Sequence, residues 1–161
     1  MAPVQSAIDE QFRRIVAEHA PAMRTLVGQG RPVLSVFRAA AEHVVSLDLR
    51  AALEAGQPEI EHVRRLVADA VLFDLRLDAA GLNYLVRGRL LREIERIAAE
   101  PEAIQRTNAL LDVCEALPFE VELGAVQAAF LLAIQEPKPE GAQGRQMELL
   151  GQRLRVQIRS E

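Results

Sequence analysis

Apolar residues recur every three or four positions along most of the chain, which is the spacing of one face of an α-helix. The first run follows Ser6, a residue that caps helix N-termini well, and predicts a helix to His19, before Pro21 interrupts it. A second run follows a loop at 28–32 and predicts a helix over 32–46, with its proline in the first turn.

Proline and glycine mark most boundaries of the remaining predicted helices. These boundary residues are Gly56, Pro58, Pro101, Pro118 and Gly124. Ser46 starts a short segment before the first of them, and Asp78 is suited to cap the longest helix. Gly81 and Gly88 lie within that helix, where each costs about 1 kcal/mol relative to alanine, so we expect both to mark a close helix crossing. The pattern predicts an all-α protein, a single-domain helical bundle of about six to seven helices over residues 1–136.

The last part of the chain, 137–161, differs from the rest. It opens with the linker-like sequence EPKPEGAQG and continues as RQMELLGQRLRVQIRSE, in which Met147, Leu150, Leu154 and Ile158 can share one helical face. We expect a linker followed by a tail helix that is loosely docked or mobile. Deletion of 137–161 is then expected to leave the melting temperature almost unchanged.

The stretch FEVEL, residues 119–123, alternates apolar and acidic residues as a strand would. No second strand pattern lies nearby, and even an isolated pair of strands is marginal. We therefore interpret it as an extended connector whose apolar residues face the core and whose Glu120 and Glu122 face water. Neighbouring carboxylates on one strand face point the same way, whereas those of glycosidases flank the scissile bond, so the connector is preferred over a catalytic pair.

Charge and composition exclude several classes of protein. A chain of 161 residues is long enough to bury a core without disulfides or metals. The net charge of −4 argues against nucleic acid as a partner. No apolar run reaches the length of a membrane span, the N-terminus lacks the features of a signal peptide, and one cysteine cannot form an internal disulfide. We expect a cytoplasmic protein that does not enter membranes.

Residues with catalytic or ligating chemistry are few and scattered. His19, His43 and His62 fall in three different predicted helices without the spacing of metal ligands. Cys114 lies in an apolar stripe and is expected to be a buried small side chain. The chain has no tryptophan and only Tyr84 as tyrosine, which disfavours a sugar-binding module, and it has no phosphate-binding loop. We expect no catalytic residue, no metal site and no cofactor in this chain.

Three segments carry a resemblance to a known family. They are FRAAAEHVV, LDAAGL, and LPFEVEL followed by Gln127, and with the segments between them they span about residues 10–135. This order resembles the helical C-terminal region of proteins related to glycoside hydrolase family 57, where it follows a catalytic barrel and is a domain of unknown function. The sequence departs from the family pattern at 122–124 and at Ala128, where an Asn-Leu-Trp-like run and a second asparagine would be expected. Nothing in this chain matches the barrel that carries the glutamate nucleophile and the aspartate acid/base.

Two functions therefore remain open. The resemblance implies a non-catalytic accessory domain that packs against a family 57-like barrel acting on α-glucans or related polysaccharides, with no hydrolytic activity of its own. The alternative is a free-standing helical scaffold that binds another protein, or itself as a homodimer. Under the first hypothesis Arg38 and Glu42, paired four residues apart, and Gln127 face the barrel or a bound glycan; otherwise Arg38 and Glu42 belong to a solvated helix face.

Overall fold

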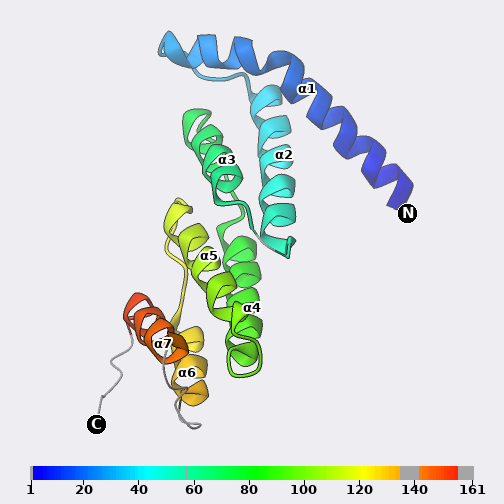
Figure 1. The fold of residues 1–161 in the computed structure, drawn as a ribbon. Coiled ribbons are helices and arrows are strands. Elements are labelled where there is room, and N and C mark those ends of the chain that lie inside the picture. The colour runs from blue at the N-terminus through cyan, green and yellow to red at the C-terminus, as the bar shows by residue number, and fades with distance from the viewer. Residues whose placement is uncertain (1, 57, 135–141, 156–161) are drawn as a thin grey trace.

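The computed structural model describes residues 2–56, 58–134 and 142–155, and within these ranges the protein is all-α, with seven helices and no strand (Figure 1). The helices are α1 (Ala2–Gly28), α2 (Ser35–Glu54), α3 (Ile60–Leu72), α4 (Ala79–Arg96), α5 (Glu102–Ala116), α6 (Gly124–Ala133) and α7 (Ala142–Arg153). The all-α fold class and the number of helices predicted from the sequence are confirmed.

Six of the helices form three successive pairs that are stacked along the molecule. In Figure 1, α2, α4 and α6 follow one another as a first row, and α3, α5 and α7 lie beside them as a second row. Each helix of the first row packs against the next, α2 on α4 and α4 on α6, and the same holds for α3, α5 and α7. Helix α1 packs against α2 and closes the N-terminal end of the stack.

Corresponding buried residues of successive helices in each row recur at a similar spacing in the sequence. In the first row the buried valines Val45, Val86 and Val126 lie 41 and then 40 positions apart. In the second row the buried leucines Leu66, Leu110 and Leu150 lie 44 and then 40 positions apart. Two-helix units of about 40–47 residues are typical of helical solenoids, in which each unit buries its apolar face against the next.

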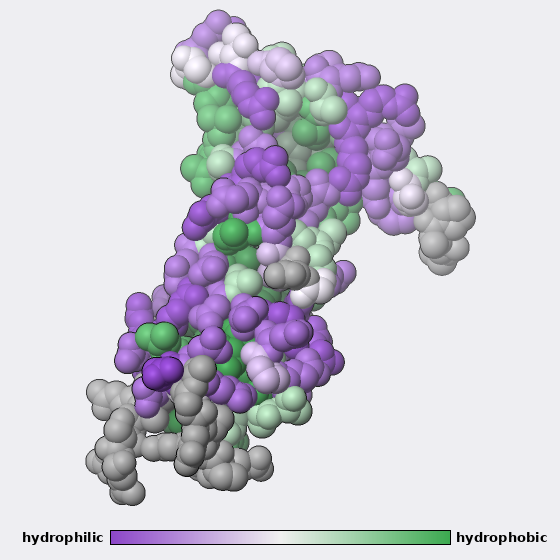
Figure 2. All heavy atoms as spheres, viewed as in Figure 1, coloured by the Kyte–Doolittle hydropathy of each residue, from purple (hydrophilic) through white to green (hydrophobic). Residues whose placement is uncertain are grey.

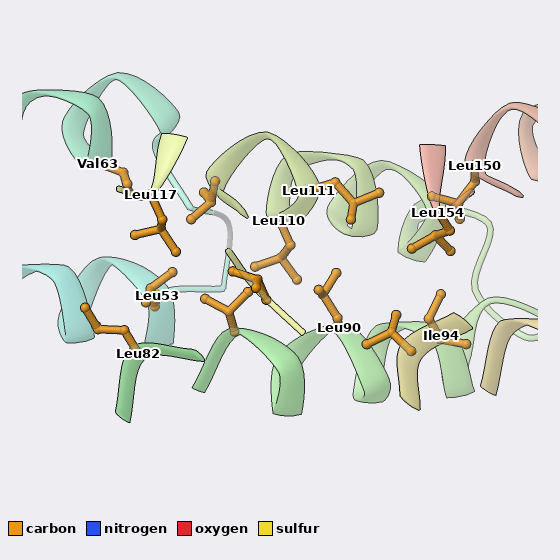
Figure 3. Packing of buried hydrophobic residues seen from close by; sticks show 14 of the residues in the cluster. Leu53, Val63, Leu82, Leu90, Ile94, Leu110, Leu111, Leu117, Leu150 and Leu154 are labelled. Carbon is orange, nitrogen blue, oxygen red and sulfur yellow. The ribbon is translucent and has the colours of Figure 1, made fainter. Parts of the chain in front are cut away.

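The core lies between the two rows. Figure 3 shows leucines of the second row, Leu110 and Leu111 of α5, directed towards Leu90 and Ile94 of α4. All four side chains are buried and belong to one cluster that runs from α2 to α7. A second, smaller cluster at the α1 end joins Met23, Val33, Ala41 and Phe73.

Three predicted helix boundaries are wrong, and in two of them packing overrides a local signal for a helix end or start. Helix α1 continues through Pro21, where one backbone hydrogen bond is lost, and Met23 beyond it is buried in the smaller cluster. Helix α2 begins at Ser35 rather than at Pro32, and it does not restart at Ser46, since its buried face continues without a break to Leu53. Each extension keeps apolar residues in contact with the core.

The N-terminus of α4 is fixed by a clasp around Asp78. As predicted, Asp78 caps the helix: its Oδ1 accepts a hydrogen bond of 2.9 Å from the Gly81 amide, while its Oδ2 accepts one of 2.5 Å from Arg50 of α2. A Cβ atom on Gly81 would lie 2.2 Å from that Oδ2, whereas one on Gly88 would meet nothing within 4 Å. The expectation that both glycines mark helix crossings is therefore wrong. Gly81 makes room for the clasp, and Gly88 faces open space.

Helix α7 is not the loosely docked tail expected from the sequence. Met147, Leu150 and Leu154 are buried and belong to the main core cluster. Arg153 fixes the end of the helix to α5, since its Nη2 donates to Asp112 at 2.7 Å. Residues 136–141 of the predicted linker and Ile158 lie outside the described residues, and the last three linker residues, 142–144, belong to α7 instead. The apolar face could be recognised from the sequence, but the surface of α5 and α6 that receives it could not.

We therefore predict that Leu150→Ala lowers the free energy of unfolding by about 2–5 kcal/mol, because it leaves a cavity in the core. The matched control is Leu149→Ala, whose side chain is 61% exposed and whose loss should change stability by less than about 0.5 kcal/mol. Urea unfolding followed by circular dichroism measures both. Equal, small effects of the two substitutions would show that α7 does not support the core. The same burial reverses the expectation that removal of 137–161 is harmless.

A second pair of substitutions tests the clasp. Gly88→Ala should stabilise the protein by about 0.5–1 kcal/mol, since alanine loses less conformational entropy in a helix and nothing obstructs its methyl group. Gly81→Ala has the same intrinsic benefit, but its methyl displaces the Asp78 carboxylate and removes a cap worth about 1 kcal/mol. Thermal unfolding should rank Gly88→Ala above the wild type and Gly81→Ala at or below it. The reverse order would contradict the role assigned to Gly81.

Candidate functional site

The FEVEL stretch borders a hollow on the protein surface. A pocket of about 660 Å³ lies between α5, α6 and the end of α7. The stretch is an extended connector as predicted: Val121 is buried, and Glu120 and Glu122 are exposed. Both glutamates line the pocket together with Gln127 and Arg153.

The polar groups of this pocket are mostly engaged in contacts that hold helices together. Arg153 Nη2 donates to Glu115 at 2.9 Å, and Glu122 lies 3.4 Å from Arg87 of α4. The Gln127 amide donates to the carbonyl of Leu154 at 2.7 Å and so ties α6 to α7. Glu120 is exposed and forms no hydrogen bond or ion pair with any residue that the structure describes. The arrangement pairs no nucleophile with a base.

Cys114 lines the same pocket, but its thiol is a weak nucleophile. Its side chain is half-buried, and burial raises the pKa of the thiol to about 12. The thiolate, which is the nucleophilic form, is therefore scarce at neutral pH. The cysteine acts as a small apolar residue, in line with its position in the apolar stripe.

The three binding residues suggested by the sequence do not form one surface. Arg38 and Glu42 do not pair with each other: the Arg38 guanidinium lies 3.6 Å from Asp74, and the Glu42 carboxylate accepts a 2.9 Å hydrogen bond from the Arg76 amide. Gln127 lies in α6, at the other end of the stack (Figure 1). Glu42 holds the segment after α3 in place, and only Arg38 borders a hollow at the α1 end.

Two of the histidines join α1 to α2. His43 Nε2 lies 2.8 Å from the Asp9 carboxylate, and the His43 ring is 4.8 Å from that of Phe12. The His19 ring lies 4.5 Å from the ring of Phe37. Among the described ranges no group of three or more histidine, cysteine or carboxylate side chains is placed to hold a metal ion.

A second hollow lies where the loop after α1 meets the C-terminal end of α3. It has a volume of about 380 Å³, and its apolar lining includes Val27, Val33 and Phe73. Arg31 and Arg38 stand at its border together with the fully exposed Asp74. The hollow is thus apolar within and more basic than acidic at its border.

Exposed apolar side chains lie within two positions of residues that line this hollow, and one of them, Leu72, is itself part of the lining. Leu34, Val36 and Leu72 are 58%, 65% and 42% exposed, and Val71 beside them is 68% exposed. Figure 2 shows hydrophobic residues on the upper left side of the molecule, below a top edge that is hydrophilic or nearly neutral. We call the surface formed by residues 27–38 and 71–74 the docking end. Residues of this kind exposed together are a frequent mark of a protein interaction site.

Sequence reasoning found Arg38 but missed the rest of the docking end. Helical spacing places Val71 on an apolar stripe of α3, yet its side chain is 68% exposed at the end of the helix. The available signal was that Leu34 and Val36 do not fall on the helical face shared by Val33 and Phe37.

No family model, curated protein or solved structure matches this chain. Within the part of the chain that the structure describes, none of the helices combines the length and the apolar character that a membrane span needs.

The raised pKa of Cys114 gives a direct prediction of reactivity. At pH 8 the folded protein should react with a thiol reagent at least tenfold more slowly than the same chain in urea, since a pKa near 12 leaves little thiolate. Reaction should accelerate as the pH rises towards 12. Absorbance of the released reagent measures the rate, and equal rates in the folded and unfolded states would show that the thiol is not shielded.

Proposed function

We propose that this chain is a non-catalytic helical scaffold that binds a protein partner at its docking end. The observation that carries the proposal is an apolar hollow lined by the exposed Leu72 and bordered by Arg31 and Arg38, with exposed Leu34 and Val36 close to its lining residues in the sequence. Interface centres are enriched in large apolar residues and arginine. The pocket at the other end offers no paired nucleophile and base that would support a catalytic alternative.

The docking end is well suited to binding because buried side chains and a hydrogen bond fix its backbone. Val33 and Phe73 are buried in the smaller core cluster, and Glu42 fixes the segment that follows α3. A surface that is already ordered loses little conformational entropy when a partner binds. The complementary partner presents an apolar side chain for the hollow and an acidic group for Arg31 or Arg38.

We further propose that this partner is the catalytic barrel of a family 57-like glycoside hydrolase that processes α-glucans. The proposal rests on the resemblance described above and on one position: the segment FRAAAEHVV is residues 37–45, contains Arg38, and begins beside the docking end. In this role the chain supplies a binding surface while the barrel supplies the chemistry.

Site-specific photo-crosslinking tests the proposal in the cell that makes this protein. A crosslinking amino acid at Val36 should trap one discrete protein partner, and Leu72→Glu in the same chain should reduce the yield at least tenfold. Glu61, on α3 away from the docking end, is the matched position for background crosslinking. Arg38→Ala should also reduce the yield, because it removes a basic group at the border of the hollow. Arg14→Ala is its control, since Arg14 is exposed, whereas Arg13 already pairs with Asp48 at 2.5 Å.

The identity of the trapped protein separates the two parts of the proposal. A glycoside hydrolase barrel in the crosslinked band supports both parts. A different, single protein supports the scaffold and removes the family 57 partner. Equal crosslinking from Val36 and Glu61 would refute the docking end itself.

A further inference from the structure

Helix α6 differs from every other helix in the stack by its composition. Its ten residues, GAVQAAFLLA, include no charged side chain, and Gln127 is its one polar residue. Each of the other six helices carries both acidic residues and arginine. The inner face of α6 is used for folding: Val126 and Phe130 are fully buried, and the helix packs on α4.

The opposite face of α6 is apolar and exposed. Ala125, Ala128 and Leu132 lie three and four positions apart, so they share one side of the helix, with Leu131 next to them. All four are exposed, and Leu132 reaches 66%. A terminal unit of a helical stack normally has a polar outer face that prevents further association. Helix α6 has the composition of an inner unit, although among the described residues it is the last helix of its row.

The stack itself indicates how such a face is covered. Helix α2 is covered by α4, and α4 by α6 (Figure 1). A continuation of this first row would place a further helix on the outer side of α6. Alanines at 125 and 128 allow a helix to approach closely, at interaxial distances of about 8–10 Å. The complementary surface is therefore another apolar helix.

The absence of charge favours a second copy of this chain over a foreign partner. In a two-fold symmetric contact the same residues meet from both sides, so a charged patch repels itself and an uncharged one does not. The docking end, with Arg31 and Arg38, has the opposite character and suits a partner of complementary charge. We propose that two copies of this chain associate through the outer faces of their α6 helices, which gives a dimer with a docking end at each extremity.

The proposed contact is small, and this sets the design of the test. A helix of ten residues is about 15 Å long, so the dimer should form and dissociate in the micromolar range. In sedimentation equilibrium the mass should rise with concentration from the 17.8 kDa of one chain towards twice that value. Leu132→Glu and Ala128→Glu should each raise the dimer dissociation constant at least tenfold, because each places two like charges in the contact.

Three controls make the outcome decisive. Leu72→Glu, at the docking end, should dimerise as the wild type does. Leu132→Glu should still crosslink to a partner from Val36. The dimer proposal and the proposed function can therefore fail separately. Circular dichroism should show unchanged helicity for both glutamate variants, since both positions are exposed. A wild-type chain that stays at 17.8 kDa at every concentration, or glutamate variants that dimerise like the wild type, would overturn the proposal.

Discussion

The structure depends on one constraint: no pair of helices in this chain can bury its apolar face alone. Each unit exposes a stripe that only the next unit covers, so the main core cluster is continuous from Val45 in α2 to Leu154 after α7. A stack of this kind gains stability from contacts between neighbours, and it leaves the two ends as the places where apolar surface stays uncovered. The docking end and the outer face of α6 are these two ends.

Polar contacts at the junctions fix how successive units sit on each other. Arg89 of α4 is buried and donates to the carbonyls of Leu53, Ala55 and Gly56, which are unpaired acceptors at the end of α2. Burial lowers the pKa of Arg89, and the nearby Glu93 opposes that shift. A buried charge satisfied in this way adds little net stability, but it permits one arrangement of the α2–α4 junction and penalises others.

Polar contacts also fix the arrangement of α4 on α5 and of α5 on α7. Glu93 is buried and accepts a 2.7 Å hydrogen bond from Arg106, which ties α4 to α5, and Arg153 ties α7 to α5. Several arginines, among them Arg89, Arg106 and Arg153, are therefore structural clasps between helices. Arg31 and Arg38 instead lie beside an apolar hollow.

The sequence by itself determined the fold class, the cap at Asp78, the extended connector and the apolar setting of Cys114, because each follows from local periodicity or from a few neighbouring residues. It also excluded any recognisable catalytic motif. Only the tertiary structure decided that Pro21 lies within a helix, that Leu150 is core, and that Arg38 and Gln127 lie at opposite ends of the molecule. These facts depend on which surfaces meet across 40 or more positions of the chain, and loops of unequal length conceal that register from the linear sequence. The exposed faces that carry the proposed interactions are what remains after such packing is complete.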